Sequence, residues 1–250
     1  MALLATDAIV LHAFDYLESS RILRLVTREG GVRSVLAKGA RRSSRRFGGG
    51  LDLFAQGTAH LYTKPGRDLD TLAGFDIARS RPALGEDLGR FTGASAVAEL
   101  TLRFGGEAAD GGLFDAVSNA FDAIAVASAG SASTATLASA WRVVAELGFA
   151  PATDICGECH AAIAPDATSM FSHAAGGTLC QRCGRTAPAG RLLPPDARHT
   201  LRQLLYGDDS LTLDEPSARA HQRLLREFLA EHLTDGRPLK ALELWEDRRW

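Results

Sequence analysis

The chain has 250 residues, of which 46% are hydrophobic, and its formal net charge is −2. A chain of this size can bury a substantial core and can hold two or three modules. Its start lacks the basic region and apolar run of a signal peptide, and no stretch reaches membrane-spanning length. These features exclude a secretory leader and a membrane span, so we expect a cytoplasmic protein without membrane contact.

Charge is distributed unevenly along the chain. Residues 1–80 carry 12 Lys or Arg side chains against 8 Asp or Glu, whereas residues 81–250 carry 16 against 22. The basic excess is concentrated in residues 30–51, which contain no acidic side chain. An acid-free basic segment of this kind indicates a polyanionic partner.

The first eighty residues predict five short strands separated by turns. We expect these strands at residues 8–11, 22–27, 32–37, 58–62 and 69–75. Glu29-Gly30-Gly31 suits a hairpin between the second and third of them. Five short strands can close into a small barrel, and the OB-fold is the five-stranded barrel that binds oligonucleotides. We therefore predict an N-terminal OB-fold domain over residues 1–80.

Beyond residue 81 the pattern becomes helical. Alanine-rich stretches predict helices at about 86–104, 113–129 and 134–147, and two later helices begin near Pro195 and between residues 214 and 216. The expected inward face of the last helix is Leu224, Leu225, Phe228, Leu229 and Leu233. Residues 81–250 should form a helical domain, which gives a multidomain α+β protein.

Four cysteines form two CxxC pairs, Cys156 with Cys159 and Cys180 with Cys183. The twenty residues between the pairs fall within the usual range for a zinc site with four thiolate ligands. Four thiolates would saturate the Zn²⁺ ion and leave no position for water or substrate, so the zinc should be structural. Gly157 and Gly184 adjoin the ligands, where we expect turns with positive φ.

Other uses of the cysteines are two disulfides, a redox CxxC or four unrelated buried thiols. A redox motif requires a βαβ context that is missing here, and zinc is favoured over all three. His160 and His173 could replace a thiol, although nothing requires it. The cysteine segment, at about residues 152–190, contains few large apolar side chains. Metal binding would therefore supply much of its folding free energy.

The basic segment offers candidate DNA contacts at Lys38, Arg41, Arg42, Arg45 and Arg46. Guanidinium groups bind phosphate oxygens in bidentate fashion, while the alternative is an ordinary solvated loop. Three nearby aromatic residues could stack on bases, although core packing is the favoured role for each. These are Phe47, Phe54 and Tyr62.

No catalytic motif is present in the sequence. We find no GxSxG, Walker A, HExxH or GxGxxG pattern, and the acidic residues are scattered. Two further classes remain open at this point. One is a zinc-ribbon transcription factor or RNA-binding factor, and the other is a zinc hydrolase or nuclease, which would need an open ligand position.

Several segments together resemble the RecO recombination mediators of bacterial DNA repair. Thr-Arg-Glu-Gly-Gly at 27–31 and Ala-Lys-Gly-Ala-Arg-Arg at 37–42 are similar to the family's N-terminal domain. Glu-Leu-Gly-Phe-Ala-Pro at 146–151 resembles the entry to its zinc segment, and Gly-Arg-Pro-Leu-Lys-Ala-Leu at 236–242 resembles its C-terminal motif. The order of the segments, more than any one of them, carries the resemblance.

The resemblance implies an OB-fold, a helical domain with an inserted zinc segment, and a protein that is not an enzyme. Family members bind single-stranded and double-stranded DNA, anneal complementary strands, and work with RecR. They help load RecA onto DNA coated by single-strand-binding protein, whose C-terminal tail contacts the helical domain. Lys38, Arg41 and Arg42 match a basic family motif and so inherit a DNA-contact role, whereas Arg45 and Arg46 are added by proximity.

Two departures from the family pattern accompany this resemblance. Some members lack the four cysteines, which indicates that zinc supports structure and takes no part in annealing. This chain also has Leu51-Asp52-Leu53-Phe54 where a Gln-Pro-Phe-like segment is expected after the basic loop. The second departure concerns the local loop conformation.

Overall fold

A computed structural model describes residues 2–41, 47, 51–64, 66, 68–107, 111–187, 190–207, 210–233 and 236–247. The chain folds into two compact units. The barrel unit comprises residues 1–132 with 239–250, and the cysteine unit comprises residues 133–238. Among the helices described, none has the length and apolar character needed to cross a bilayer.

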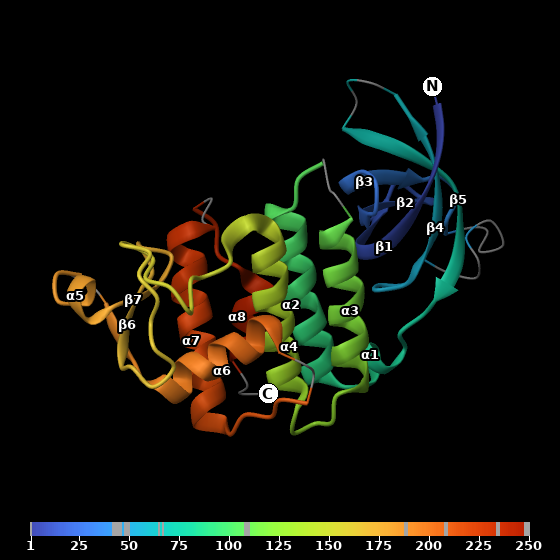
Figure 1. The fold of residues 1–250 in the computed structure, drawn as a ribbon. Coiled ribbons are helices and arrows are strands. Elements are labelled where there is room, and N and C mark those ends of the chain that lie inside the picture. Colours follow the sequence, from blue (N-terminus) through green and yellow to red (C-terminus); the bar gives the residue numbers. More distant parts are fainter. Residues whose placement is uncertain are drawn as a thin grey trace. The chain divides into compact units, whose positions relative to one another are not determined.

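The barrel unit begins with five strands that close into a barrel (Figure 1). Their order around the barrel is β1-β2-β3-β5-β4, and all neighbours are antiparallel except the parallel pair β3 and β5. The strands are β1 Ala2–Tyr16, β2 Ser20–Thr27, β3 Gly31–Ala37, β4 Gln56–Thr63 and β5 Leu69–Arg79. The five predicted strands are confirmed, and each is longer than its sequence pattern indicated.

Strand β1 extends furthest beyond its predicted limits. Its first half, Ala2 to Ile9, pairs with β4, and its second half, Ala8 to Tyr16, pairs with β2. The two paired regions overlap at Ala8 and Ile9, and a register shift between Val10 and His12 interrupts the pairing with β2. One strand therefore closes the barrel and then continues as one arm of the β1–β2 hairpin.

Side chains alternate between the two faces of the sheet along each strand, and one face points into the barrel. Ala8, Val10, Leu23, Leu25, Val35, Leu61 and Phe75 belong to this core. Phe47 and Leu51, from the connection between β3 and β4, are buried in the same cluster. This connection therefore returns to the barrel interior after the basic segment.

Helices complete the barrel unit, and the described ones are α1 Ala83–Glu86, α2 Leu88–Phe104, α3 Gly112–Val126 and α8 Lys240–Glu246. Asp87 caps α2 by accepting a hydrogen bond from the backbone N–H of Arg90. Helix α8, which the sequence pattern did not predict, packs on α2 (Figure 1). The Glu99 carboxylate of α2 accepts hydrogen bonds from the N–H groups of Ala241 and Leu242 and so caps the first turn of α8.

Arg81 joins the barrel to its helices. Its side chain is 2% exposed, and its guanidinium donates to the backbone oxygen of Phe54 at 2.9 Å and to Gln56 Oε1 at 2.8 Å. The same group donates to Ser118 Oγ and pairs with Asp122 on α3. The donors of one guanidinium are thus satisfied by several different parts of the barrel unit.

The cysteine unit combines helices with a small sheet. The helices are α4 Ala132–Val144, α5 Gln181–Gly184, α6 Pro195–Tyr206 and α7 Glu215–His232. The sheet has the order β7-β6-β8, with β6 Ser169–Ser172, β7 Gly177–Leu179 and β8 Arg191–Leu193. Trp141 of α4 is fully buried against Phe228 of α7, with ring centroids 5.3 Å apart. The predicted apolar face of α7 is confirmed, because all five of its residues are buried.

Replacing Arg81 tests whether this residue fastens the barrel to the helices. Arg81→Leu should lower the free energy of unfolding by about 3 kcal/mol, because it leaves the buried Phe54 carbonyl without a donor and breaks the pair between the buried guanidinium and Asp122. Urea denaturation of the full chain measures this. The control is Arg79→Leu, which removes a half-exposed partner of the same Asp122 and should cost less than about 1 kcal/mol. Equal losses from both changes would contradict the special role of Arg81.

Candidate metal centre and basic surface

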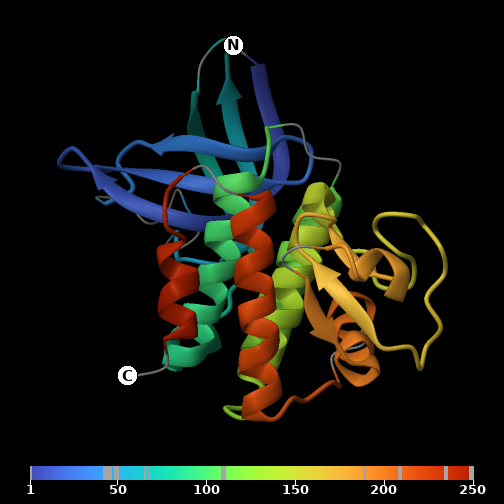
Figure 2. The ribbon, with the colours of Figure 1, turned by 90° about the vertical axis from the view of Figure 1, so that its left-hand side faces the viewer.

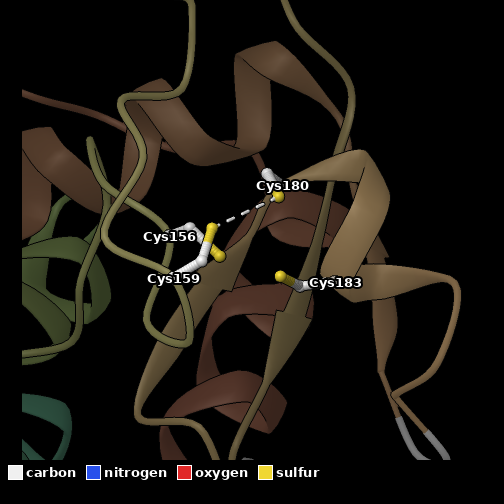
Figure 3. Close-up of side chains that lie close together, drawn as sticks. All are labelled: Cys156, Cys159, Cys180 and Cys183. Atoms are coloured by element: carbon white, nitrogen blue, oxygen red, sulfur yellow. Dashed lines mark hydrogen bonds between the residues drawn. The ribbon is translucent and has the colours of Figure 1, made fainter.

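The four cysteine side chains converge on one point in the cysteine unit (Figure 3). Their Sγ atoms all lie within 4.8 Å of one another, and all four are free thiols. A tetrahedral ion with metal–sulfur bonds of about 2.3 Å would separate its ligand atoms by roughly 3.8 Å. Cys159 Sγ and Cys180 Sγ lie 3.8 Å apart. The four thiols therefore form a site that could hold a metal ion.

The first CxxC pair lies in a tight turn. The backbone N–H of Cys156 donates to the oxygen of Ala161, and that of His160 donates to the oxygen of Cys156. His160 has a φ of 59°, in the left-handed region, which lets the chain reverse directly after Cys159. This turn brings both sulfurs to the side that faces Cys180 and Cys183 (Figure 3).

The second CxxC pair uses the end of a strand and the start of a helix. Cys180 directly follows β7 and is the N-cap residue of α5, and Cys183 lies within that helix. The short helical turn thus separates the two thiols by the spacing that a shared ion requires. The sequence prediction that the two pairs come together is confirmed by this geometry.

The two glycines beside the cysteines have a different role from the one expected. Neither Gly157 nor Gly184 has a positive φ, so that prediction was wrong. A Cβ atom at Gly157 would lie 2.5 Å from the backbone oxygen of Ala175, and one at Gly184 would lie 2.6 Å from Met170 Cγ. Close packing around the site, and not left-handed backbone, therefore requires glycine at both positions.

Thiol acidity differs among the four residues. Burial raises the pKa of Cys156, but hydrogen bonds from backbone N–H groups, including those of Cys159 and Cys180, outweigh it and lower that pKa to about 6. The pKa of Cys159 is lowered mainly by a backbone hydrogen bond from Ala161. A hydrogen bond to Cys159, together with burial, raises the pKa of Cys183. A metal cation binds thiolates, so its binding would displace the proton that Cys183 holds.

Little apolar material surrounds the thiols. The local cluster buries Cys156, Ile163 and Leu179, with Met170 and the other cysteines packed against them. This is the small core that the sequence predicted. A cluster of this size contributes little hydrophobic free energy, so the segment depends on its ligand set and on its attachment to the helices.

Helices α6 and α7 hold the cysteine segment within its unit. Arg198 of α6 donates to the backbone oxygens of Ala164 and Pro165. Glu227 of α7 pairs with both His173, which directly follows β6, and Arg191, which begins the neighbouring strand β8. Because His173 is engaged in this way, it is not one of the clustered metal-ligating residues that the structure describes.

Lys38 and Arg41 of the basic segment lie immediately after β3, and both are exposed. Among the residues that the structure describes, Lys38 forms no salt bridge. The backbone N–H of Arg41 donates to the oxygen of Ser19 at 3.1 Å, and its guanidinium donates to the oxygen of Glu18. The basic segment is thereby fixed to the β1–β2 turn. The other predicted contacts, Arg42, Arg45 and Arg46, lie outside the described residues.

The three predicted aromatic residues divide between core and surface. Phe47 and Phe54 are buried, so core packing, the role that the sequence favoured for them, is confirmed, and neither is available to stack on bases. Phe54 has a φ of 67°, and its ring packs against Phe121 with centroids 4.8 Å apart. The segment 51–54 therefore ends in a buried residue with left-handed backbone. Tyr62 remains exposed on β4.

Two exposed aromatic residues, Phe14 and Tyr16, escaped the sequence analysis because the first strand was ended at Leu11. Both lie on β1 where it pairs with β2. The period-two spacing of His12, Phe14 and Tyr16 was the signal that could have revealed them. Their position on the hairpin to which Arg41 is bonded makes them part of the basic surface.

Serine substitution tests the metal centre directly. Cys156→Ser or Cys180→Ser should reduce the bound metal from about one ion per chain to near zero, because three thiolates hold the ion much less tightly. Elemental analysis of the purified protein measures this, and limited proteolysis should then cut first between residues 152 and 187. The control is His160→Asn, which tolerates left-handed backbone and should keep the ion. Metal loss in the control would make His160 a ligand.

Two family models match the chain. Residues 1–81 match the model described as Recombination protein O N terminal, and residues 85–243 match the one described as Recombination protein O C terminal. The two matches together cover nearly the whole sequence.

Curated relatives that carry the name DNA repair protein RecO agree with these matches. The chain is 32% identical to that of Rubrobacter xylanophilus, over 95% of this chain and 94% of the relative. It is 34% identical to that of Myxococcus xanthus over the same shares, and 35% identical to that of Anaeromyxobacter sp. strain K over 93% and 92%. The resemblance that the sequence segments indicated is confirmed, and the chain belongs to the RecO family.

Proposed function

We propose that this chain acts in DNA repair and homologous recombination as a mediator that binds DNA and anneals complementary strands. Family membership along the whole chain supports this role. The single structural observation that carries it is that the two described cations of the basic segment, Lys38 and Arg41, are exposed and that Arg41 is fixed to the barrel. Such a surface neutralises phosphate charge on either single-stranded or double-stranded DNA.

We further propose that the barrel of residues 1–80 is an OB-fold and forms the DNA-binding domain. Five strands, closure and a single parallel pair between β3 and β5 support this assignment. The loop after β3 carries Lys38, Arg41, Arg42, Arg45 and Arg46, which we assign to phosphate contacts. Arg33 is left out of this set because it pairs with the buried Asp70 at 3.1 Å.

Annealing then follows from charge neutralisation and proximity. Two complementary strands bound to one basic surface repel each other less, and their local concentration is higher than in solution. Pairing accelerates without any covalent step. The proposal therefore requires no catalytic residue, and the protein is not an enzyme.

The metal is proposed to be Zn²⁺ in a structural role. Cys156, Cys159, Cys180 and Cys183 offer four sulfur ligands, the donor set that is typical of structural zinc. When bound, zinc would supply the free energy that the small surrounding core lacks. All four of its coordination positions would be filled by protein, which opposes a zinc hydrolase or nuclease.

The partners proposed are RecR, the C-terminal tail of single-strand-binding protein and, indirectly, RecA. With RecR, the protein would help load RecA onto DNA coated by single-strand-binding protein in the cytoplasm. Family membership supports this part of the proposal. The assay that addresses it is annealing of complementary strands that have first been coated with single-strand-binding protein.

Salt dependence tests the proposed phosphate contacts. If five side chains each meet a phosphate, the logarithm of the affinity for single strands should fall with the logarithm of salt concentration at a slope of about −3.5. This estimate uses about −0.7 for each contact. Fluorescence anisotropy at several salt concentrations gives the slope, and a slope near zero would refute binding through this surface.

Charge reversal then locates the contacts. The double change Lys38→Glu and Arg41→Glu should weaken binding of single strands and duplex alike and should slow annealing in parallel. The control is Lys240→Glu, an equal change of charge per residue at the start of α8, which should leave DNA binding unchanged. Annealing that survives the double change would place the DNA site elsewhere. A strong preference for one defined sequence would instead favour a zinc-ribbon transcription or RNA-binding factor.

A further inference from the structure

The β1–β2 hairpin presents an exposed apolar tip. Phe14 is 44% exposed, Tyr16 is 42% exposed, and Leu17 in the turn is 76% exposed. Leu17 also has a φ of 54°, a left-handed conformation that is unfavourable for a leucine. Figure 2 shows the tip of this hairpin projecting from the barrel. Large apolar side chains in such a position indicate a binding surface more than a structural one.

The register shift near Val10 determines which face these rings occupy. Val10 faces the barrel core, and beyond the shift Ala13 packs against the same core. The intervening alternation therefore turns His12, Phe14 and Tyr16 to the outer face of the hairpin. The rings of His12 and Phe14 lie 5.8 Å apart at an angle of 49°. Aromatic side chains thus follow one another along a single strand at a spacing of two residues.

Positive charge adjoins these rings on the same hairpin. Arg41 is tied to the turn by its hydrogen bonds to Ser19 and Glu18. Asp15, between the two aromatic residues in sequence, pairs with Arg21 at 3.1 Å and with Arg41 at 3.6 Å. The arginines and the exposed rings therefore lie on one hairpin tip, with the rings on its outer face and Asp15 and Arg21 on the other, next to a segment of the chain without acidic residues.

We propose that the outer face of this hairpin, formed by Phe14 and Tyr16, stacks on unpaired bases of single-stranded DNA whose phosphates contact Arg41. The inference rests on the proposed DNA-binding function and adds to it a preference for single strands. Aromatic rings beside arginine are the combination that binds single strands without sequence preference. Bases in a duplex are already stacked on one another, so they gain nothing from these rings.

The test compares three DNA probes with the full chain by fluorescence anisotropy. The probes are an oligothymidylate, an abasic strand of equal length, and a duplex of equal length. The double change Phe14→Ala and Tyr16→Ala should weaken oligothymidylate binding about tenfold or more, from at least about 1.4 kcal/mol of lost stacking. Affinity for the abasic strand and for the duplex should change less than about twofold, because their phosphate contacts are retained.

Matched variants separate loss of stacking from loss of structure. Tyr16→Phe retains the ring and should bind oligothymidylate like the original protein, whereas Phe14→Leu retains apolar bulk without a ring and should bind it more weakly. Tyr206→Ala, at a tyrosine that is 65% exposed on α6, should have no effect. If the alanine double variant misfolds, as thermal unfolding would report, the Phe14→Leu result decides alone.

The outcomes also separate this inference from the proposed function. If charge reversal at Lys38 and Arg41 weakens all three probes while the aromatic variants bind like the original protein, the stacking proposal is overturned and the DNA-binding function stands. If charge reversal affects none of the probes, the proposed function itself fails. Unchanged DNA affinity together with loss of RecR binding in the aromatic variants would make the face a protein-docking surface and would also overturn the proposal.

Discussion

The pairing of one long strand with two neighbours is the constraint on which the barrel unit depends. Strand β1 pairs with β4 through Ala2 to Ile9 and with β2 through Ala8 to Tyr16, so both of its neighbours in the closed barrel depend on the continuity of this one strand. Val10 lies at that shift, where its N–H and oxygen bond to Ala55 and Phe54 just before β4. Phe54 in turn offers its own oxygen to Arg81. One short stretch of backbone therefore links three features: closure of the barrel, the return of the loop after the basic segment, and attachment of the helices.

The cysteine unit is stabilised in a different way. Its helices bury large side chains such as Trp141 and Phe228, but the segment between Cys156 and Cys183 contributes few apolar groups to any core. Its fold depends on four converging thiols and on polar contacts from α6 and α7. Binding of a metal ion to the thiols would stabilise this segment first. Among the residues that the structure describes, no element of the barrel contributes a ligand. This separation places the candidate metal chemistry and the candidate DNA surface in different units.

Local patterns predicted the parts of the molecule that local interactions specify. Strands β2 and β3 follow from their β-branched residues and from Glu29-Gly30-Gly31, and the cysteine cluster follows from its spacing. Helix α8 escaped prediction because its first turn is capped by Glu99, which lies 142 residues away in sequence from Ala241. The outer half of β1 escaped because pairing with β2, and not the propensity of its own residues, makes it a strand. The aromatic face was missed for the same reason: the period-two spacing of His12, Phe14 and Tyr16 is visible in the sequence, but the face that these residues take depends on the register shift in the pairing with β2.

Selectivity for single strands cannot come from the basic segment alone. Phosphates are present in both forms of DNA, and Arg41 already has a partial counterion in Asp15, with which it forms an exposed and therefore weak pair. Exchange of this carboxylate for a phosphate would gain little net free energy, so the proposed contact of Arg41 would position a strand more than discriminate between strands. Bases are the feature that differs between the two forms, since only single strands offer them unstacked. The rings that can meet those bases lie on the hairpin to which Arg41 is bonded, so phosphate and base contacts would be made on one rigid ribbon and not on separate loops.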